Sequence, residues 1–304
     1  VDTPLNSTVI SGASTFETSG SPTNMPFTTT GNGLLDANSI SAAGESSCAV
    51  WADGGMKCWG HDGEGQLGNG GTTGNKNTPS TSVSLPASRD AVATTSGSLG
   101  HSCAIVDNGD AYCWGEGEKG KLGYGKTVDK TSPQKVGLPS GRDAVDISAG
   151  GYHSCAVLDN GSAMCWGTGM LGDGKYYSCV NTQYCSGSTY ASSPVHLTLP
   201  AGREAISISF GTNFQCVVLD NGSAMCTGFN DVGQIGDGSI CSSSTYDAGC
   251  SNFSTGWPDT SKVYGKATPS YVSIPTGRTV TALEAYNYFA CAILDNGSVM
   301  CWGE

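Results

Sequence analysis

Cysteine is the residue type in this chain whose number and spacing point to specific chemistry. All 14 cysteines fall into short-range pairs. Cysteines in such pairs either form disulfides, which indicates an oxidising compartment, or bind zinc. In five pairs the two cysteines are ten positions apart: Cys48–Cys58, Cys103–Cys113, Cys155–Cys165, Cys216–Cys226 and Cys291–Cys301. Two further pairs lie between these: Cys179–Cys185 and Cys241–Cys250.

Zinc is the less favoured chemistry. The sequence contains no Cys-x-x-Cys, and its four histidines, His61, His101, His153 and His196, do not lie at ligand spacing from the cysteines. His101 and His153 each precede a cysteine by two residues at equivalent places, so we expect them to be structural. The sequence therefore predicts seven disulfides and no metal site.

The ten-residue spacing predicts a β-hairpin between the two cysteines of a pair. In the copy from Cys155 to Cys165, Asp159-Asn160-Gly161 would form a three-residue loop with Gly161 in the left-handed conformation. That loop places the two cysteines opposite each other at a non-hydrogen-bonded position, where Cα atoms lie about 4.5 Å apart and a disulfide can form. A two-residue turn on Asn-Gly would instead oppose Cys155 to Trp166 and separate the sulfurs. The three-residue loop is therefore the prediction.

The hairpins recur with their flanking segments at intervals of 55, 52, 61 and 75 residues. A short alternating strand precedes each hairpin, as in residues 144–150, and a proline-led strand ending near an arginine follows later. Four strands per repeat are typical of one blade of a β-propeller. Between hairpin and proline-led strand lies a glycine-rich turn: GQLGNG from Gly65, GKLGYG from Gly120, GMLGDG from Gly169 and GQIGDG from Gly233.

These motifs, in fixed order, resemble the regulator-of-chromosome-condensation (RCC1) family, whose repeats carry an AG-x-x-H-x-x-A-L…DG…WG…GQLG…P pattern. The resemblance covers residues 37–304 and implies an all-β RCC1-like propeller with at least five four-stranded blades. The paired cysteines are unlike the eukaryotic nuclear member and point to secreted relatives, and five hairpins are visible where the family usually closes seven blades. The implied blades are 37–86, 87–139, 140–200, 201–275 and an incomplete 276–304.

Composition bears on partners and location. The formal net charge of −12 makes a nucleic-acid or anionic-membrane partner unfavourable, and no apolar run is long enough to insert into a membrane. All four arginines, Arg89, Arg142, Arg203 and Arg278, occupy the same repeat position, so we expect them to be structural. Together with the cysteines, this predicts an extracellular or cell-surface protein.

The two ends of the chain suggest how an incomplete blade is completed. Residues 1–36 are rich in Ser, Thr, Gly and Asn and read as a tail or linker, yet residues 3–10 resemble the proline-led strand at 78–85. The fifth repeat ends at Glu304 after its third strand. The segment 3–10 could close its own ring, which we favour, or be donated to a neighbouring subunit in a filament.

Catalytic motifs are not apparent: G-x-S-x-G, H-E-x-x-H and P-loop sequences are absent, so we expect no enzyme and no cofactor. Asp173 and Asp237 in Gly-Asp-Gly turns could bind calcium, although aspartate also favours such turns by itself. Asn6 and Asn252 are candidate glycosylation sites. Asn160, Asn221 and Asn296 also lie in Asn-Gly-Ser, but there turn preference already explains the sequence.

Two insertions, residues 175–192 and 239–267, lengthen the third and fourth repeats at the same position. Equivalent loops of adjacent blades project from one face, which is often the binding face. Their aromatic residues amid Ser, Gly, Asn and Thr are typical of a recognition surface. The candidate binding residues are Tyr176, Tyr177, Tyr184, Tyr190, Tyr246, Phe253, Trp257 and Tyr264.

The sequence therefore predicts an extracellular structural or binding propeller that engages a protein, a glycan or its own copies through the inserted loops and an edge strand. One alternative is a secreted enzyme inhibitor. A second is a subunit of an extracellular filament built by strand donation. A guanine-nucleotide exchange factor, the role of the nuclear family member, is disfavoured by the disulfides and the acidity.

Overall fold

The computed structural model describes residues 37–72, 74–177, 190–242, 249–254 and 262–304. Within that part of the chain nearly all regular structure is β-strand, with one 3₁₀ turn, η1 (Glu118–Gly120), and no helix is long and apolar enough to cross a bilayer. The segment 3–10 and the pair Cys179–Cys185 lie outside the described residues. The all-β fold class predicted from the sequence is confirmed.

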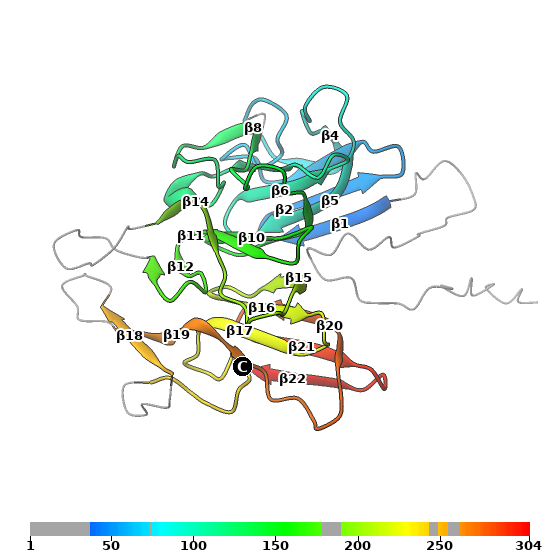
Figure 1. The fold of residues 1–304 in the computed structure, drawn as a ribbon. Helices are drawn as coiled ribbons and strands as arrows, with labels where there is room; N and C mark the ends of the chain where they lie inside the picture. Colours follow the sequence, from blue (N-terminus) through cyan, green and yellow to red (C-terminus); the bar gives the residue numbers. More distant parts are fainter. Residues whose placement is uncertain (1–36, 73, 178–189, 243–248, 255–261) are drawn as a thin grey trace, which may run out of the picture.

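The strands form five successive antiparallel sheets, which follow one another in an arc (Figure 1). Their strand orders are β1-β2-β3-β4, β5-β6-β7-β8, β9-β10-β11-β14, β15-β16-β17-β19-β18 and β20-β21-β22. The first two sheets consist of β1 (Ala37–Ala43), β2 (Ser46–Trp51), β3 (Met56–Gly60), β4 (Lys76–Ser82), β5 (Ala91–Gly97), β6 (His101–Val106), β7 (Ala111–Gly115) and β8 (Lys130–Lys135).

The later sheets keep this plan with additions. The fourth sheet gains a fifth strand, the fifth sheet has three strands, and β12 pairs with β13 in a separate small hairpin. Their strands are β9 (Ala144–Ala149), β10 (His153–Leu158), β11 (Ala163–Gly167), β12 (Gly169–Met170), β13 (Tyr176–Tyr177), β14 (Ala191–His196), β15 (Ala205–Phe210), β16 (Phe214–Leu219), β17 (Ala224–Phe229), β18 (Ser251–Ser254), β19 (Lys262–Tyr271), β20 (Val280–Tyr286), β21 (Phe289–Leu294) and β22 (Val299–Gly303).

The hairpin register is the predicted one. Cys155 lies opposite Cys165 with Cα atoms 4.0 Å apart and the sulfurs bonded. The Leu158 amide donates to the Ser162 carbonyl, and Gly161 has φ of 73°. The four other ten-residue pairs form the same bridge, and Cys241 is bonded to Cys250. Six of the seven predicted disulfides are thus confirmed, and the seventh lies outside the described residues.

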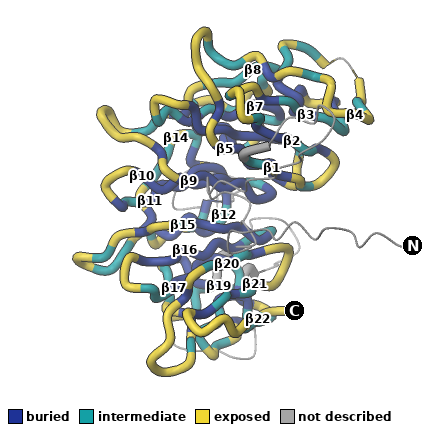
Figure 2. The backbone as a smooth tube through the Cα atoms, turned by 90° about the vertical axis from the view of Figure 1, so that its right-hand side faces the viewer, coloured by how far each residue is buried: buried dark blue, intermediate teal, exposed yellow. Residues whose placement is uncertain are grey.

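A hydrophobic layer lies between each sheet and the next, and Figure 2 shows the buried strands that form these layers and the exposed turns around them. We call the face of a sheet toward the next sheet its downstream face. Between the first two sheets, the disulfide Cys48–Cys58 and Val50 pack against Ala104 and Trp114. The hairpin disulfides therefore belong to the cores between sheets.

A tryptophan secures three of these four layers, and Thr227 stands at its position between the third and fourth sheets. The Trp114 indole N–H donates to the Gln66 carbonyl in the glycine-rich turn of the preceding repeat, at 2.9 Å, and Trp166 makes the same bond to Lys121 at 2.9 Å. The turn passes so close to the ring that a Cβ on Gly68 would lie 2.6 Å from the indole nitrogen of Trp114. This contact explains why the turn and the Cys-Trp-Gly sequence recur together.

The first strand of each sheet is an edge strand, and in the second to fifth sheets side chains of the preceding sheet cap its free amides. Ser41 Oγ accepts from the Ser96 amide at 2.9 Å, and Ser209 Oγ accepts from the Ala285 amide at 2.9 Å. Asp146 does the same with one carboxylate oxygen, which accepts from the Ile208 amide at 2.9 Å. Edge amides that would otherwise pair with foreign strands are satisfied in this way.

The downstream face of the fifth sheet has no sheet against it among the described residues. Its disulfide Cys291–Cys301 is accessible, with Cys301 exposed, and Val299 is 64% exposed. The hairpin cysteines of the first four sheets are at most 1% exposed. The fifth sheet thus presents to solvent the kind of apolar face that the first four sheets bury.

Two histidines lie in the layers between sheets, as expected for structural residues. His101 and His153 are buried; His101 Nε2 lies 2.9 Å from Ser154 Oγ, and the His153 ring packs edge-on against Phe210 with centroids 4.5 Å apart. Burial lowers the pKa of His153 to about 4 and also lowers the pKa of His101, where nearby Lys121 adds to the effect.

We expect the protein to lose stability in acid through these histidines. A pKa of about 4 for folded His153, below the ordinary value of 6.5, means that the unfolded chain takes up the proton first. Stability is therefore complete above pH 6.5 and falls toward pH 4, by about 3 kcal/mol for this residue. His153→Phe, which installs the side chain of the equivalent Phe214, should remove that part of the loss. Urea unfolding at pH 7 and pH 4 measures it, and an unchanged pH dependence in the variant would contradict this assignment.

Candidate binding surface

The strands of each sheet end in two different kinds of turn. Each third strand begins at the hairpin turn and ends at the glycine-rich turn, so these turns lie at opposite ends of the sheets. We call them the hairpin end and the insertion end, because both insertions follow glycine-rich turns. In Figure 1, β12, which pairs with β13 at the start of the first insertion, lies on the same side of the molecule as β18 of the second insertion.

The third-repeat insertion starts with an anchored tyrosine. Tyr177 is buried, and its hydroxyl donates to Asp173 Oδ2 at 2.7 Å. Burial and the neighbouring carboxylate raise the pKa of this phenol. Tyr176 is half-buried and Tyr190 is 38% exposed. Of the described candidates here, Tyr177 holds the segment in place, and Tyr190 is open to solvent.

The fourth-repeat insertion extends its sheet. β18 pairs with β19, and Tyr264, which is half-buried, receives a backbone hydrogen bond from the Asn230 amide at 3.2 Å. Asn252 and Phe253 lie in β18, and only their backbone is described. Tyr184, Tyr246 and Trp257 lie outside the described residues, so their predicted role in binding stays a prediction.

The two insertions adjoin. β12 packs against β17 and β19, which belong to the next sheet. The Met170 carbonyl accepts from Gln215 Nε2 at 2.8 Å, and a Cβ on Gly265 would lie 2.8 Å from the Met170 sulfur. The base of the first insertion is therefore fixed to the base of the second.

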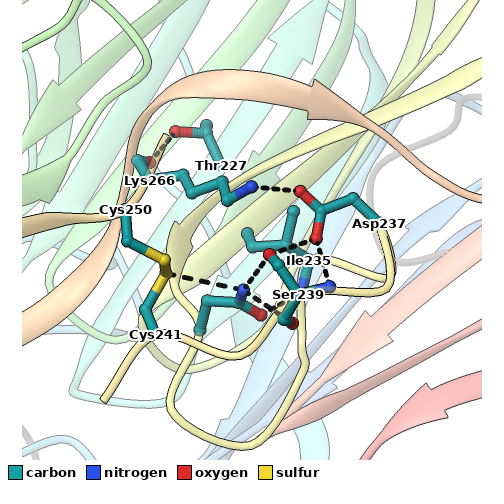
Figure 3. Close-up of polar contacts among 8 residues, drawn as sticks. Thr227, Ile235, Asp237, Ser239, Cys241, Cys250 and Lys266 are labelled. Carbon is teal, nitrogen blue, oxygen red and sulfur yellow. Dashed lines mark hydrogen bonds and ion pairs between the residues drawn. A yellow bond between two sulfur atoms is a disulfide. The ribbon is translucent and has the colours of Figure 1, made fainter. Parts of the chain in front are cut away.

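A buried polar cluster holds the second insertion (Figure 3). Lys266, whose side chain is 6% exposed, forms an ion pair with Asp237, and Ser239 donates to the same carboxylate. The side-chain Nδ2 of Asn230 donates to the Ser239 carbonyl at 3.0 Å and lies 3.7 Å from the Cys241 sulfur. Burial raises the pKa of Asp237, but the hydrogen bonds from Lys266 and Ser239 outweigh it, and the net pKa is lowered.

This cluster bears on the calcium hypothesis. Asp237 is engaged by an ammonium group and Asp173 by a phenol, so neither carboxylate is left open to a cation. In the described ranges, no three His, Cys, Asp or Glu side chains gather as they would around a metal ion. The geometry favours the turn-forming role of both aspartates. The sequence pattern did not point to Lys266, because lysine in a proline-led strand has no distinctive signature.

Aromatic side chains at the insertion end of the fifth sheet were also not anticipated. Tyr286, Tyr288 and Phe289 lie around the β20–β21 turn and are 65%, 40% and 37% exposed. The second, third and fourth repeats have glycine at the position of Tyr286, and a Cβ on Gly97 would lie 2.5 Å from the Gly150 carbonyl in the next sheet. A tyrosine in place of that glycine is the signal that could have found this patch.

The hairpin end is regular by comparison. Each arginine pairs with the aspartate of the hairpin turn in its own repeat, as in Arg142–Asp159 at 3.2 Å, so the structural role predicted for the arginines is observed. One pocket at this end, of about 320 Å³, is lined among others by Trp51, Lys57 and Arg89. The Lys57 ammonium nitrogen lies there over the Trp51 ring, 5.9 Å from the ring centroid.

Comparison with known proteins finds repeats of one kind in parts of this chain. The model of the regulator of chromosome condensation (RCC1) repeat matches residues 108–157, and a second RCC1 repeat model matches 92–121 and 280–304. The human E3 ubiquitin-protein ligase HERC2 is 29% identical over 266 residues, and the Arabidopsis thaliana ultraviolet-B receptor UVR8 is 27% identical over 268 residues. These matches cover 84% and 85% of this chain, which spans 5% and 53% of the two relatives.

Solved structures agree with the fold. Human WBSCR16 superposes with a TM-score of 0.69 at 16% identity, covering 88% of this chain and 62% of that one. Prp20p of Saccharomyces cerevisiae superposes with a TM-score of 0.64 at 19% identity, covering 88% of this chain and 57% of that one. With its repeated four-stranded sheets, tryptophan–glycine contacts and bridged hairpins, this chain has the fold of an RCC1-like repeat β-propeller with hairpin disulfides.

Proposed function

We propose that this chain is an extracellular binding propeller that recognises a protein or glycan at its insertion end. The observation that carries the proposal is the departure from repeat regularity at that end: two adjoining insertions and the exposed aromatic patch Tyr286, Tyr288 and Phe289. Repeat-periodic residues serve the scaffold, whereas irregular aromatic loops on one face serve recognition. The six observed disulfides support an oxidising, extracellular setting.

The relatives favour a protein partner over catalysis. The description of Prp20p names its binding to Gsp1p and histones, so a propeller of this fold can present a protein-binding face. Acidic partners are disfavoured here, because the net charge of −12 repels acidic surfaces and all four arginines are paired with aspartates. Guanine-nucleotide exchange therefore remains the disfavoured function.

Matched variants at the two ends test the proposal. Tyr190→Ala and Tyr286→Ala remove exposed aromatics at the insertion end, whereas Ile206→Ser removes a side chain that is 56% exposed at the hairpin end. Binding to a glycan array and to the extracellular protein fraction of the source cells should fall about tenfold or more for the first two, as expected for an aromatic anchor. Ile206→Ser should bind like the parent.

The opposite pattern would reject the insertion end as the binding surface. Melting temperatures should be unchanged in all three variants, because none of these side chains is buried. Trp257→Ala extends the test to the predicted residues outside the described ranges.

Self-association is a second candidate, favoured by one feature. Among the described residues β22 has no strand on its outer side, whereas the equivalent β3, β7, β11 and β17 each pair with a proline-led strand. Unpaired edges and exposed apolar sheet faces bind further strands. A peptide of residues 3–10 should then shift native particles to smaller assemblies in light scattering, and no change in particle size would count against strand donation.

A further inference from the structure

Three of the hairpin turns share an Asn-Gly-Ser sequence and one geometry. In the turns at Asn160, Asn221 and Asn296, the serine amide donates to the asparagine Oδ1 at 3.2, 3.1 and 3.0 Å. The serine hydroxyl donates to the same oxygen at 2.7 Å in all three. The asparagines are exposed, and within the described residues their Nδ2 atoms have no hydrogen-bond partner. The oxygen of each amide is used and the nitrogen is free.

The other two turns show what the fold itself needs. In the second repeat, Asn108 Oδ1 accepts from the Asp110 amide at 3.3 Å, and its Nδ2 is engaged by the Asp110 carboxylate at 3.2 Å. In the first repeat, Asp53 Oδ1 accepts from the Gly55 amide at 2.9 Å. The turn thus requires an oxygen acceptor at the position of Asn160, and it does not require a hydroxyl two residues later, at the position of Ser162. Turn preference explains Asn-Gly but does not explain the serine.

We propose that Asn160, Asn221 and Asn296 are N-glycosylated. Asn-x-Ser with a residue other than proline in the middle is the acceptor sequence for this modification, and it requires surface exposure in an exported protein. The co-substrate is an oligosaccharide linked to a polyprenyl pyrophosphate. The amide Nδ2 forms a bond to the sugar C1, the bond from C1 to the phosphate oxygen breaks, the lipid pyrophosphate leaves, and the amide loses one proton.

The fold tolerates this modification without rearrangement. A sugar on Nδ2 leaves Oδ1 free to keep both serine hydrogen bonds of the turn. The buried residue of the turn is Gly161, which lies against Glu204 of the next repeat, whereas Asn160 faces solvent. All three sites lie at the hairpin end. These three glycans therefore lie at the end opposite the insertions.

Glycopeptide mass spectrometry of the protein purified from its natural source tests the proposal. Peptides with Asn160, Asn221 and Asn296 should carry saccharide mass on the asparagine, and the Asn108 peptide should carry none. Unmodified asparagine at all three positions overturns the proposal. This outcome is independent of partner binding, because the insertion end is not involved.

Single substitutions expressed in the same cells separate the acceptor sequence from the turn. Ser162→Ala should abolish the modification at Asn160 and leave Asn221 modified, whereas Ser162→Thr should retain both. Asp110→Ser creates an acceptor sequence at Asn108 and should add a glycan at that turn. Saccharide that persists on Asn160 after Ser162→Ala, or is lost after Ser162→Thr, overturns the proposal. Unchanged melting temperatures are expected, because Gly55 and Asp110 show that the position of Ser162 tolerates other side chains.

Discussion

Replacing Trp166 by alanine is expected to lower the free energy of unfolding by about 3–5 kcal/mol, as for other buried tryptophans. The indole is 0% exposed, fills the layer between the second and third sheets, and donates to the Lys121 carbonyl. Its removal leaves both a cavity and a carbonyl with one bond fewer. Urea-induced unfolding followed by circular dichroism measures the loss.

Trp59 supplies a matched control within the same chain. It stands in the same Cys-Trp-Gly sequence, but it belongs to the first sheet, is half-buried, and has no glycine-rich turn of a preceding repeat among the described residues. Trp59→Ala should therefore cost about 1 kcal/mol or less, as for other incompletely buried positions. Equal losses in the two variants would show that the contact with the preceding turn does not stabilise the array.

The second large effect concerns the disulfides. In the folded protein, a thiol reductant should open Cys291–Cys301 roughly tenfold or more faster than Cys155–Cys165, because exchange needs direct access of a thiolate to sulfur. Cys155 and Cys165 are both 0% exposed, whereas Cys301 is exposed. Timed alkylation followed by peptide mass spectrometry gives both rates.

The two bridges close hairpins with the same sequence separation of ten residues. In urea, where both are accessible, their rates should converge, which controls for intrinsic differences in reactivity. Equal rates in the folded protein would mean that the downstream face of the fifth sheet is covered. Protection that appears only at high protein concentration would identify a second copy as the cover.

The scaffold could be predicted from sequence because it is periodic. One loop length fixes the register of a hairpin, so the facing of Cys155 and Cys165 follows from Asp159-Asn160-Gly161 alone. The role of the arginines followed in the same way, since a residue that recurs at one repeat position has one structural partner. Five copies of the hairpin and four of the arginine made these predictions robust.

The candidate binding surface was less accessible, because it lies where periodicity fails. Both Tyr177 and Tyr190 looked like recognition residues, yet Tyr177 is 5% exposed and bonded to Asp173. Burial depends on how the inserted segment folds back, and a single insertion has no second copy for comparison. Lys266 was missed for the same reason. Its partner Asp237 lies 29 residues away, in a turn whose sequence gave no sign of a distant partner.

Two kinds of contact between sheets also share one direction. In the tryptophan contacts and the edge-strand caps described above, the earlier repeat supplies the acceptors, such as the Gln66 carbonyl and Ser41 Oγ, and the later repeat supplies the donors, Trp114 and the Ser96 amide. A chain synthesised from its N-terminus therefore completes each acceptor site before the donor that fits it has left the ribosome. Each finished repeat is a template for its successor, and synthesis at about 5–20 residues per second gives each repeat of this length several seconds to dock before the next emerges.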